Sequence, residues 1–138
     1  MSERFASARV ARLATSGPDG PHVVPISFAV AGDVIYHAVD HKPKRTTALK
    51  RLDNLRADPR ASVLVDHYDE DWEQLWWERA DGVASILAPG HAEALAALQA
   101  KYPQYAERPP EGPVVSIKVS RWSAWSAAAP PRGGRAAS

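Results

Sequence analysis

Bulky and small residues alternate along much of the chain, most clearly in residues 22–30, HVVPISFAV. In an extended chain the bulky side chains share one face: Val24, Ile26, Phe28 and Val30. The small side chains share the other face: Val23, Pro25, Ser27 and Ala29. We expect the bulky face to be core, while the smooth face leaves space for a flat ligand or for a packed helix. Pro25 has no N–H, which favours a sheet edge or an irregular position.

Patterns of this kind predict six β-strands. The segments between them contain turn residues, such as SGPDGP at residues 16–21 and AGD at residues 31–33. The predicted strands are residues 9–15, 22–30, 34–40, 61–68, 77–87 and 114–125. Because most of them are joined as hairpins, the sequence predicts a mainly β fold, a six-stranded antiparallel barrel with helical inserts.

Two helices are predicted between these strands. The first has an N-cap at Thr46 or Thr47 and runs to about Leu55, before Pro59 ends it. The second covers residues 89–102. The acidic, Trp-bearing segment 69–78 is expected to be a partly helical connection, and residues 103–113 a loop.

The length of 138 residues suits one domain, which we place at residues 1–126, followed by a disordered tail at residues 127–138. The chain has no cysteine, which excludes disulfides, thiolate metal sites and a cysteine nucleophile. The histidines lack the spacing of a metal site, so no metal is expected. A net charge of +1 argues against nucleic-acid binding. With neither a long apolar run nor a signal peptide, we expect a cytoplasmic protein with no membrane contact.

Positive charge is concentrated in one short stretch, DHKPKRTTALKR, at residues 40–51. It carries five cations opposed by Asp40 alone: Lys42, Lys44, Arg45, Lys50 and Arg51. Exposed cations at a helix N-terminus cost about 0.3–1 kcal/mol each, because the helix end is itself partly positive. A bound phosphate would reverse this cost, since it accepts hydrogen bonds from helix N–H groups, hydroxyls and cationic side chains. The alternative is a solvated basic loop.

All five tryptophans follow residue 70: Trp72, Trp76, Trp77, Trp122 and Trp125. Large flat side chains can form the wall of a pocket for a flat ring, or can lie in the core or in a dimer interface. The chain has neither a Walker loop nor a G-x-G-x-x-G motif after a strand, which argues against nucleotide sites of those kinds.

Three stretches resemble the pyridoxamine 5'-phosphate oxidase-like family of flavin- and deazaflavin-binding proteins: RLATSGPDGPHVVPISF (12–28), VIYHAVDHKPKRTTALKRLDNLRADPRASVLVDHY (34–68) and WWERADGVASI (76–86). The resemblance covers about residues 5–125. It implies a six-stranded split β-barrel of the FMN-binding type. Within the family, the chain resembles the subgroup described as F420-dependent oxidoreductases, whose deazaflavin has a phosphate-bearing tail. Other branches bind FMN or haem breakdown products. The additional Arg and His residues of true pyridoxamine phosphate oxidases are not found here.

The resemblance also implies a cofactor site. The phosphate would be held by Lys44, Arg45, Thr46, Thr47 and Lys50, with His41 next to this basic turn. The flat ring would be lined, mainly through backbone, by His22, Val24, Pro25, Ile26 and Ser27. Trp77 and Arg79 correspond to the strand that approaches the ring, often from the partner subunit. Because the family site lies between two subunits, a homodimer is implied.

The function that this resemblance implies is hydride transfer between coenzyme F420 and a small unsaturated or planar organic acceptor. An FMN-dependent oxidoreductase of the same fold and a non-catalytic flavin carrier or sensor are the alternatives. DNA binding by the basic turn is a more remote one. The catalytic residues, the proton donor and the substrate stay open, since the cofactor carries the hydride chemistry.

Overall fold

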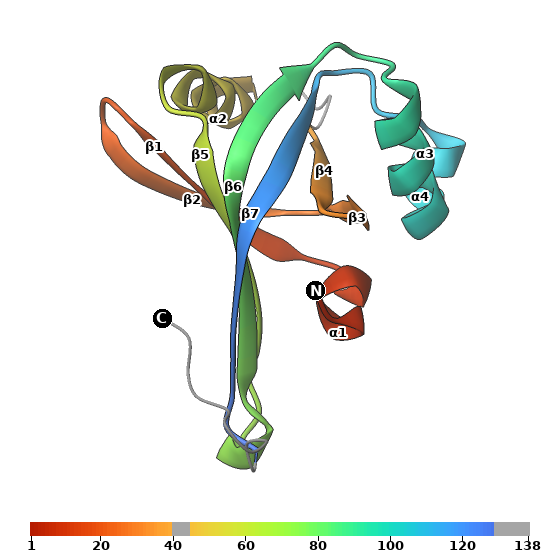
Figure 1. The fold of residues 1–138 in the computed structure, drawn as a ribbon. Coiled ribbons are helices and arrows are strands. Elements are labelled where there is room, and N and C mark those ends of the chain that lie inside the picture. The colour runs from red at the N-terminus through yellow and green to blue at the C-terminus, as the bar shows by residue number, and fades with distance from the viewer. Residues whose placement is uncertain (40–44, 129–138) are drawn as a thin grey trace.

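The computed structural model describes residues 1–39 and 45–128, and within them seven antiparallel strands form one sheet (Figure 1). The strand order is β2-β1-β5-β6-β7-β4-β3. The strands are β1 (Ala11–Gly17), β2 (Gly20–Ile26), β3 (Ala29–Ala31), β4 (Val34–Ala38), β5 (Arg60–His67), β6 (Trp76–Leu87) and β7 (Val114–Ser126). The mainly β, antiparallel fold predicted from the alternating pattern is therefore confirmed.

The predicted number of strands is wrong because residues 22–30 form two strands. The chain leaves β2 after Ile26, and β3 then pairs with β4 at the other end of the sheet order. At the crossing, the N–H of Phe28 donates to the Tyr102 hydroxyl at 3.0 Å, and the Phe28 ring is fully buried. Ala29 is also buried, so the small residues 23–29 do not share one open face.

Pro25 lies on an edge strand, as its missing N–H predicts. Strand β2 stands first in the sheet order and, among the described strands, pairs with β1 alone. Pro21 and Pro25 cannot donate to β1, so they take the ladder positions that point away from it. Val23 lies midway between them, and its N–H therefore points to the open edge of the sheet.

Five helical segments accompany the sheet within residues 1–39 and 45–128. They are α1 (Glu3–Ser7), α2 (Arg45–Ala57), the 3-10 turn η1 (Trp72–Gln74), α3 (Ala92–Lys101) and α4 (Pro103–Glu107). The first predicted helix is confirmed as α2, and η1 gives the partly helical connection expected within residues 69–78. The second predicted helix starts later and is followed by α4, which lies in the predicted loop. Helix α1 has no counterpart among the predicted helices; it is a single turn capped by Ser2 and anchored by the buried Phe5.

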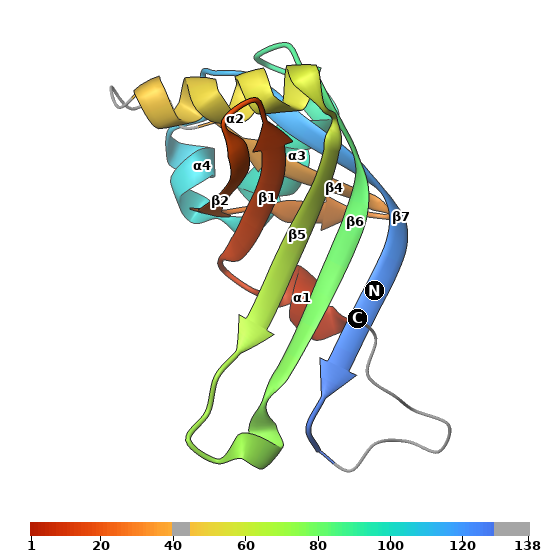
Figure 2. The same cartoon turned by 90° about the vertical axis from the view of Figure 1, so that its left-hand side faces the viewer.

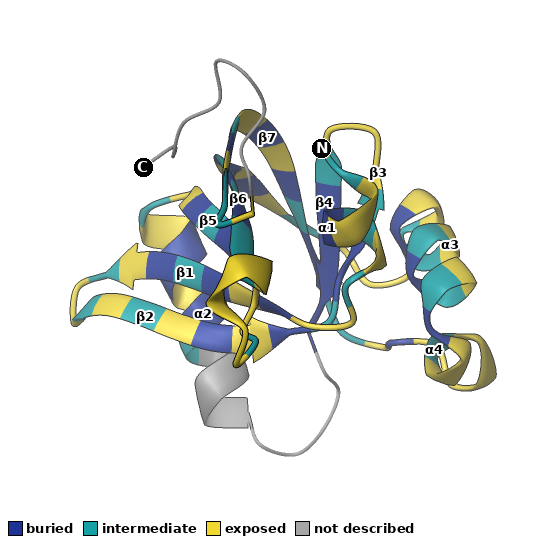
Figure 3. Ribbon diagram, turned by 90° about the horizontal axis from the view of Figure 1, so that it is seen from below, coloured by how far each residue is buried: buried dark blue, intermediate teal, exposed yellow. Residues whose placement is uncertain are grey.

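The core has two parts. The larger lies inside the curved sheet, where buried side chains alternate with exposed ones along the strands (Figure 3). It includes Val24, Ile26 and Phe28, so the prediction that these are core residues is confirmed. The smaller part lies under α3, where Leu98 and Tyr102 pack with Tyr36 of β4. Strands β5, β6 and β7 continue beyond the region that α2 and α3 cover (Figure 2).

Candidate functional site

The basic corner, which we define as residues 40–51, includes the start of α2. His41 and Lys44 lie outside the described residues. Arg45, Thr46 and Thr47 lie in the first turn of α2, so both of the predicted N-cap residues, Thr46 and Thr47, lie inside the helix. This turn has no acidic side chain to balance the partial positive charge of the helix end. The structure therefore places a helix N-terminus within the stretch of sequence where the cations are concentrated.

Lys50, predicted to bind phosphate, forms an ion pair with Asp19. Asp19 lies at the turn between β1 and β2, so this pair links α2 to the hairpin. The hydrogen bond from Lys50 and its positive charge lower the pKa of Asp19. Both side chains reach solvent, and such a pair adds little to stability.

The neighbouring Arg51 is buried and bonded to a buried histidine. Its Nη1 atom lies 2.6 Å from Nε2 of His37 in β4, and Nδ1 of that ring lies 3.2 Å from the backbone oxygen of Ser27. Since a carbonyl can only accept, Nδ1 carries the proton and Nε2 accepts from Arg51. Burial lowers the pKa of His37 to about 3, helped by the charge of Arg51, so the imidazole is neutral at physiological pH. Neither residue was predicted as a site residue.

The segment NLRADPR, residues 54–60, has a structural role here. The buried side-chain amide of Asn54 donates to the Thr15 hydroxyl in β1 at 3.2 Å. A Cβ atom on Gly17 would lie 1.9 Å from Asn54 Oδ1, so this close contact requires glycine. After the helix, Asp58 accepts from the backbone and side chain of Arg60, which lowers the pKa of Asp58 to about 2. The segment thus fixes α2 against β1 and leads into β5.

The residues predicted to line the ring lie on β2 and at its end. The side chains of Val24 and Ile26 are buried in the core, so these two could meet a ligand only through backbone. His22 has a buried Nδ1 atom that lacks a hydrogen-bond partner among the described residues. The Ser27 hydroxyl lies 3.1 Å from the Tyr105 hydroxyl of α4. His22 is therefore the predicted residue that carries an unsatisfied polar atom.

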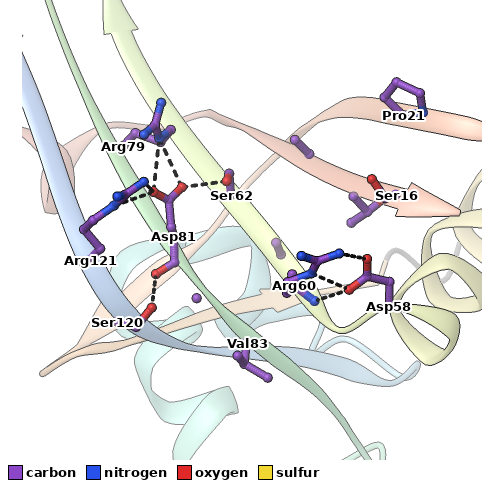
Figure 4. A pocket seen from close by; sticks show the side chains of 14 residues that line it. Ser16, Pro21, Asp58, Arg60, Ser62, Arg79, Asp81, Val83, Ser120 and Arg121 are labelled. Atoms are coloured by element: carbon purple, nitrogen blue, oxygen red, sulfur yellow. Dashed lines mark hydrogen bonds and ion pairs between the residues drawn. The ribbon is translucent and has the colours of Figure 1, made fainter. Parts of the chain in front are cut away.

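Trp77 and Arg79 lie on the outer face of the sheet, and Arg79 lines an open cavity of about 730 Å³ (Figure 4). Its Nε donates to Asp81 at 3.0 Å, and Ser62 and Arg121 donate to the same carboxylate at 2.6 and 3.2 Å. Burial acts to raise the pKa of Asp81, but the hydrogen bonds from Ser62, Arg79 and Arg121 and the charge of Arg79 lower it.

This outer-face cavity depends on an irregularity in β6. The register of β6 against β7 shifts between Asp81 and Gly82, and Ser120 donates to the Asp81 backbone oxygen at 3.1 Å. A Cβ atom on Gly82 would lie 2.2 Å from the Lys118 backbone oxygen. The close approach of the two strands therefore requires glycine at residue 82, and the bulge orients Asp81 and Arg121 toward one another.

In one chain, the two groups of predicted site residues lie apart. Arg79 of β6 is opposite Leu64 of β5. Leu64 is in turn opposite Arg12 of β1, and Arg12 is opposite Pro25 of β2. Two strands thus separate Arg79 from Pro25. The tryptophans are also dispersed: Trp122 packs edge-on against Phe5 at 5.1 Å, the Arg4 guanidinium lies 4.2 Å above Trp76, and Trp72 is exposed. They do not form one pocket wall.

The described residues were also searched for metal-ligand clusters and for membrane-spanning helices. Residues 1–39 and 45–128 contain no cluster of three or more His, Cys, Asp or Glu side chains placed to hold a metal ion. Within the same ranges, no helix is long and apolar enough to span a membrane.

A family comparison then decides what this fold is. The model for pyridoxamine 5'-phosphate oxidase matches residues 1–126. The chain belongs to this family. The resemblance noted in the sequence is thereby confirmed, and with it the split-barrel fold class, with seven strands in place of six. The search among curated proteins found no match.

Solved structures of similar fold include proteins with different ligands. A conserved hypothetical protein from Mycobacterium tuberculosis is 28% identical, with 92% of this chain and 86% of that chain covered and a TM-score of 0.67. An FAD-binding protein from Mesorhizobium loti is 22% identical, with coverages of 87% and 85% and a TM-score of 0.65. The heme storage protein HutZ from Vibrio cholerae is 14% identical, with coverages of 86% and 85% and a TM-score of 0.65.

Proposed function

We propose that the protein is a homodimeric oxidoreductase that passes a hydride between coenzyme F420 and a small unsaturated or planar organic acceptor. The observation that carries the proposal is the basic corner at the N-terminus of α2, in a chain that matches the pyridoxamine 5'-phosphate oxidase family over residues 1–126. When bound, the deazaflavin supplies the hydride chemistry, which explains why the chain needs no nucleophile–base set.

In the proposal, the phosphate of a ring cofactor is held at the N-terminus of α2, whose backbone N–H groups are donors. The sequence adds the cations Lys44, Arg45 and Lys50 and the hydroxyls of Thr46 and Thr47, which are the donors that a phosphate requires. Lys44 and the side chains of residues 45–49 lie outside the described part of the chain. The N–H of Val23 points to the open edge of β2, and the buried Nδ1 of His22 lacks a partner among the described residues. In the proposed complex, these two groups orient the polar edge of the ring.

The homodimer is part of the proposal because, in one chain, two strands separate Arg79 from Pro25 and the neighbouring ring-lining residues of β2, although Pro21 at the start of β2 lines the same cavity as Arg79. A second copy packed on the outer face would bring Trp77 and Arg79 to a neighbouring β2. The open cavity around Arg79 and Asp81, on the outer face of the sheet, supports the proposal of such a surface.

An FMN-dependent oxidoreductase is the second candidate, favoured by the FAD-binding protein of similar fold. The two can be separated by titrating the purified protein with F420 and with FMN while following tryptophan fluorescence. We expect tighter binding of F420, and oxidation of reduced F420 when a planar acceptor is added. Tighter binding of FMN would favour the second candidate. Binding without turnover of any acceptor would favour a carrier, and binding of neither cofactor would contradict the proposal.

A further inference from the structure

The connection between β5 and β6 holds two aromatic side chains in solvent. Trp72 is 69% exposed and Tyr68 is 62% exposed, and Nε1 of the indole donates to the Tyr68 hydroxyl at 3.4 Å. The backbone around them is tied down, because Asp71 caps η1 and the N–H of Ala127 donates to the Leu75 carbonyl at 3.0 Å. Exposed rings held in a fixed arrangement favour contact with another molecule.

The same connection is strongly acidic. Residues 61–78 contain no Lys or Arg, but they include five carboxylates between residues 66 and 73: Asp66, Asp69, Glu70, Asp71 and Glu73. Among the described residues, Asp69 alone of these five pairs with a basic side chain, that of His67 at 3.7 Å. We call residues 66–75 the acidic tip. It projects with β5 and β6 beyond the region that α2 and α3 cover (Figure 2). A partner that fits it is cationic and offers apolar surface to the two rings.

The cavity around Asp81 on the outer face of the sheet has this complementary character (Figure 4). Three guanidinium groups and two carboxylates line it, from Arg60, Arg79, Arg121, Asp58 and Asp81. The side chains of Arg60 and Arg121 are 83% and 67% exposed, so each can stack on a ring or accept a second carboxylate. Val83, 51% exposed, adds apolar surface. The volume of about 730 Å³ is enough to take in an aromatic side chain.

Within one chain, the acidic tip cannot reach this cavity, because both belong to the same pair of strands. Trp76 and Asp81 are five residues apart on β6, which is about 17 Å of extended strand. A second copy of the chain can supply the tip. When two outer faces pack with their β6 strands antiparallel, each tip lies near the cavity of the other copy. Two-fold symmetry makes the contact reciprocal, so that no tip and no cavity is left over.

We propose that the protein forms a two-fold dimer in which the acidic tip of each subunit occupies the arginine-lined cavity of the other. Trp72 and Tyr68 pack on Val83 and on the guanidinium faces, while Glu70 and Glu73 pair with arginines of the cavity. The inference rests on the homodimer of the proposed function, and it goes further by naming the two surfaces that meet. The opposite charges of these surfaces also guide the two copies into register.

A charge exchange tests this pairing. The tip variant carries Glu70→Lys and Glu73→Lys, and the cavity variant carries Arg60→Glu and Arg121→Glu. Each alone should raise the dissociation constant of the dimer by about 10-fold or more, because like charges then face each other. An equimolar mixture should recover the wild-type constant. Each mixed dimer has one wild-type contact and one contact with both charges reversed. Sedimentation velocity over a range of concentrations measures the constants, and thermal unfolding checks the fold of each variant.

Crosslinking reports the contact directly, since the chain has no cysteine of its own. Glu73→Cys is mixed with Val83→Cys and treated with a bis-maleimide. We expect a covalent dimer from this mixture. The control mixes Glu73→Cys with Ala96→Cys, at an exposed position on α3, and should give almost none.

A mixture of the charge variants that dimerises as weakly as its components would overturn the inference, and so would equal crosslinking at residues 83 and 96. Either result, with a dimeric wild type, leaves the proposed function in place. A wild type that is monomeric at every concentration would contradict the homodimer of the proposed function together with the inference. If the cavity variant does not fold, Arg121→Glu alone is mixed with Glu73→Lys, and the same recovery decides.

Discussion

The imidazole of His37 illustrates how much of this protein depends on where single side chains are buried. In the sequence it is one histidine among five, on a predicted strand. In the structure, its two nitrogens lie between the Ser27 carbonyl and the Arg51 guanidinium. Protonation of Nε2 would place an N–H opposite the Arg51 guanidinium in a buried region. The neutral form of His37 is therefore strongly favoured.

This burial predicts a specific pH dependence of stability. The unfolded chain protonates His37 near pH 6.5, but the folded protein does so only near pH 3. The pKa of His37 is lower in the folded protein than in the unfolded chain. The contribution of neutral His37 to the free energy of unfolding is therefore complete above pH 6.5 and is lost as the pH falls toward 3. The free energy of unfolding should therefore decrease by about 1.4 kcal/mol per pH unit below 6.5 because of this residue.

The measurement is urea unfolding of the cofactor-free protein between pH 7 and pH 4, followed by tryptophan fluorescence. Carboxylates such as Asp58 also titrate toward the acid end, so His37→Gln serves as the matched control. The difference in free energy between wild type and variant should shrink as the pH falls. Parallel curves for the two proteins would show that His37 does not remain neutral.

At the scale of elements, α2 was predictable and its surroundings were not. Pro59 marks the C-terminal end of the helix in the sequence, because this signal acts through local backbone sterics, whereas the predicted N-cap residues Thr46 and Thr47 lie inside α2. The division of residues 22–30 into β2 and β3 has no local signal, since the alternation continues through Ser27 and Phe28. It results from a tertiary contact, the hydrogen bond from the Phe28 N–H to Tyr102 of α3's C-terminal end.

The role assigned to the basic corner gives a second prediction. Lys44→Ala combined with Lys50→Ala should weaken binding of the phosphate-bearing cofactor by about 10- to 100-fold or more, because charge-assisted hydrogen bonds contribute roughly 1.5–3 kcal/mol each. The matched control is Lys118→Ala, which removes a surface lysine paired with Asp33. Isothermal titration calorimetry measures the dissociation constant of the cofactor for each variant. If the double variant and the control bind equally well, the corner does not hold the phosphate.

At the scale of the whole molecule, one face of the sheet is left open in the single chain. The outer face of β5, β6 and β7 carries the Asp81 network together with Val83, a β-branched apolar side chain that is 51% exposed. Interfaces between subunits combine an apolar core with a polar rim, and Val83 beside the Asp81 network offers both kinds of side chain. The proposed homodimer would cover this face.

Val83→Asp tests this arrangement. Burying an added carboxylate in an interface costs desolvation energy even beside Arg60, the cross-strand neighbour of Val83, so the variant should shift the protein from dimer toward monomer. Ala96→Asp adds the same charge to an exposed position on α3 and should leave the dimer intact. Sedimentation velocity over a range of concentrations distinguishes the two states. A wild type that sediments as a monomer, or a Val83→Asp variant that remains dimeric, would contradict the placement of the interface.

The sequence by itself determined the properties that arise from neighbouring residues. These are the alternation that builds an antiparallel sheet, the edge position of Pro25, the helix after the basic stretch and the family to which the motifs belong. Only the tertiary structure decided that Lys50 pairs with Asp19, that Arg51 is held by a buried neutral His37, and that Arg79 belongs to a network around Asp81. The physical reason is that these contacts need elements that are distant in the sequence. His37 and Arg51 are 14 positions apart, Asp19 and Lys50 are 31 positions apart, and Ser62 and Arg121 reach Asp81 from the paired strands β5 and β7. The neutral state of His37 also depends on burial, which no local pattern encodes.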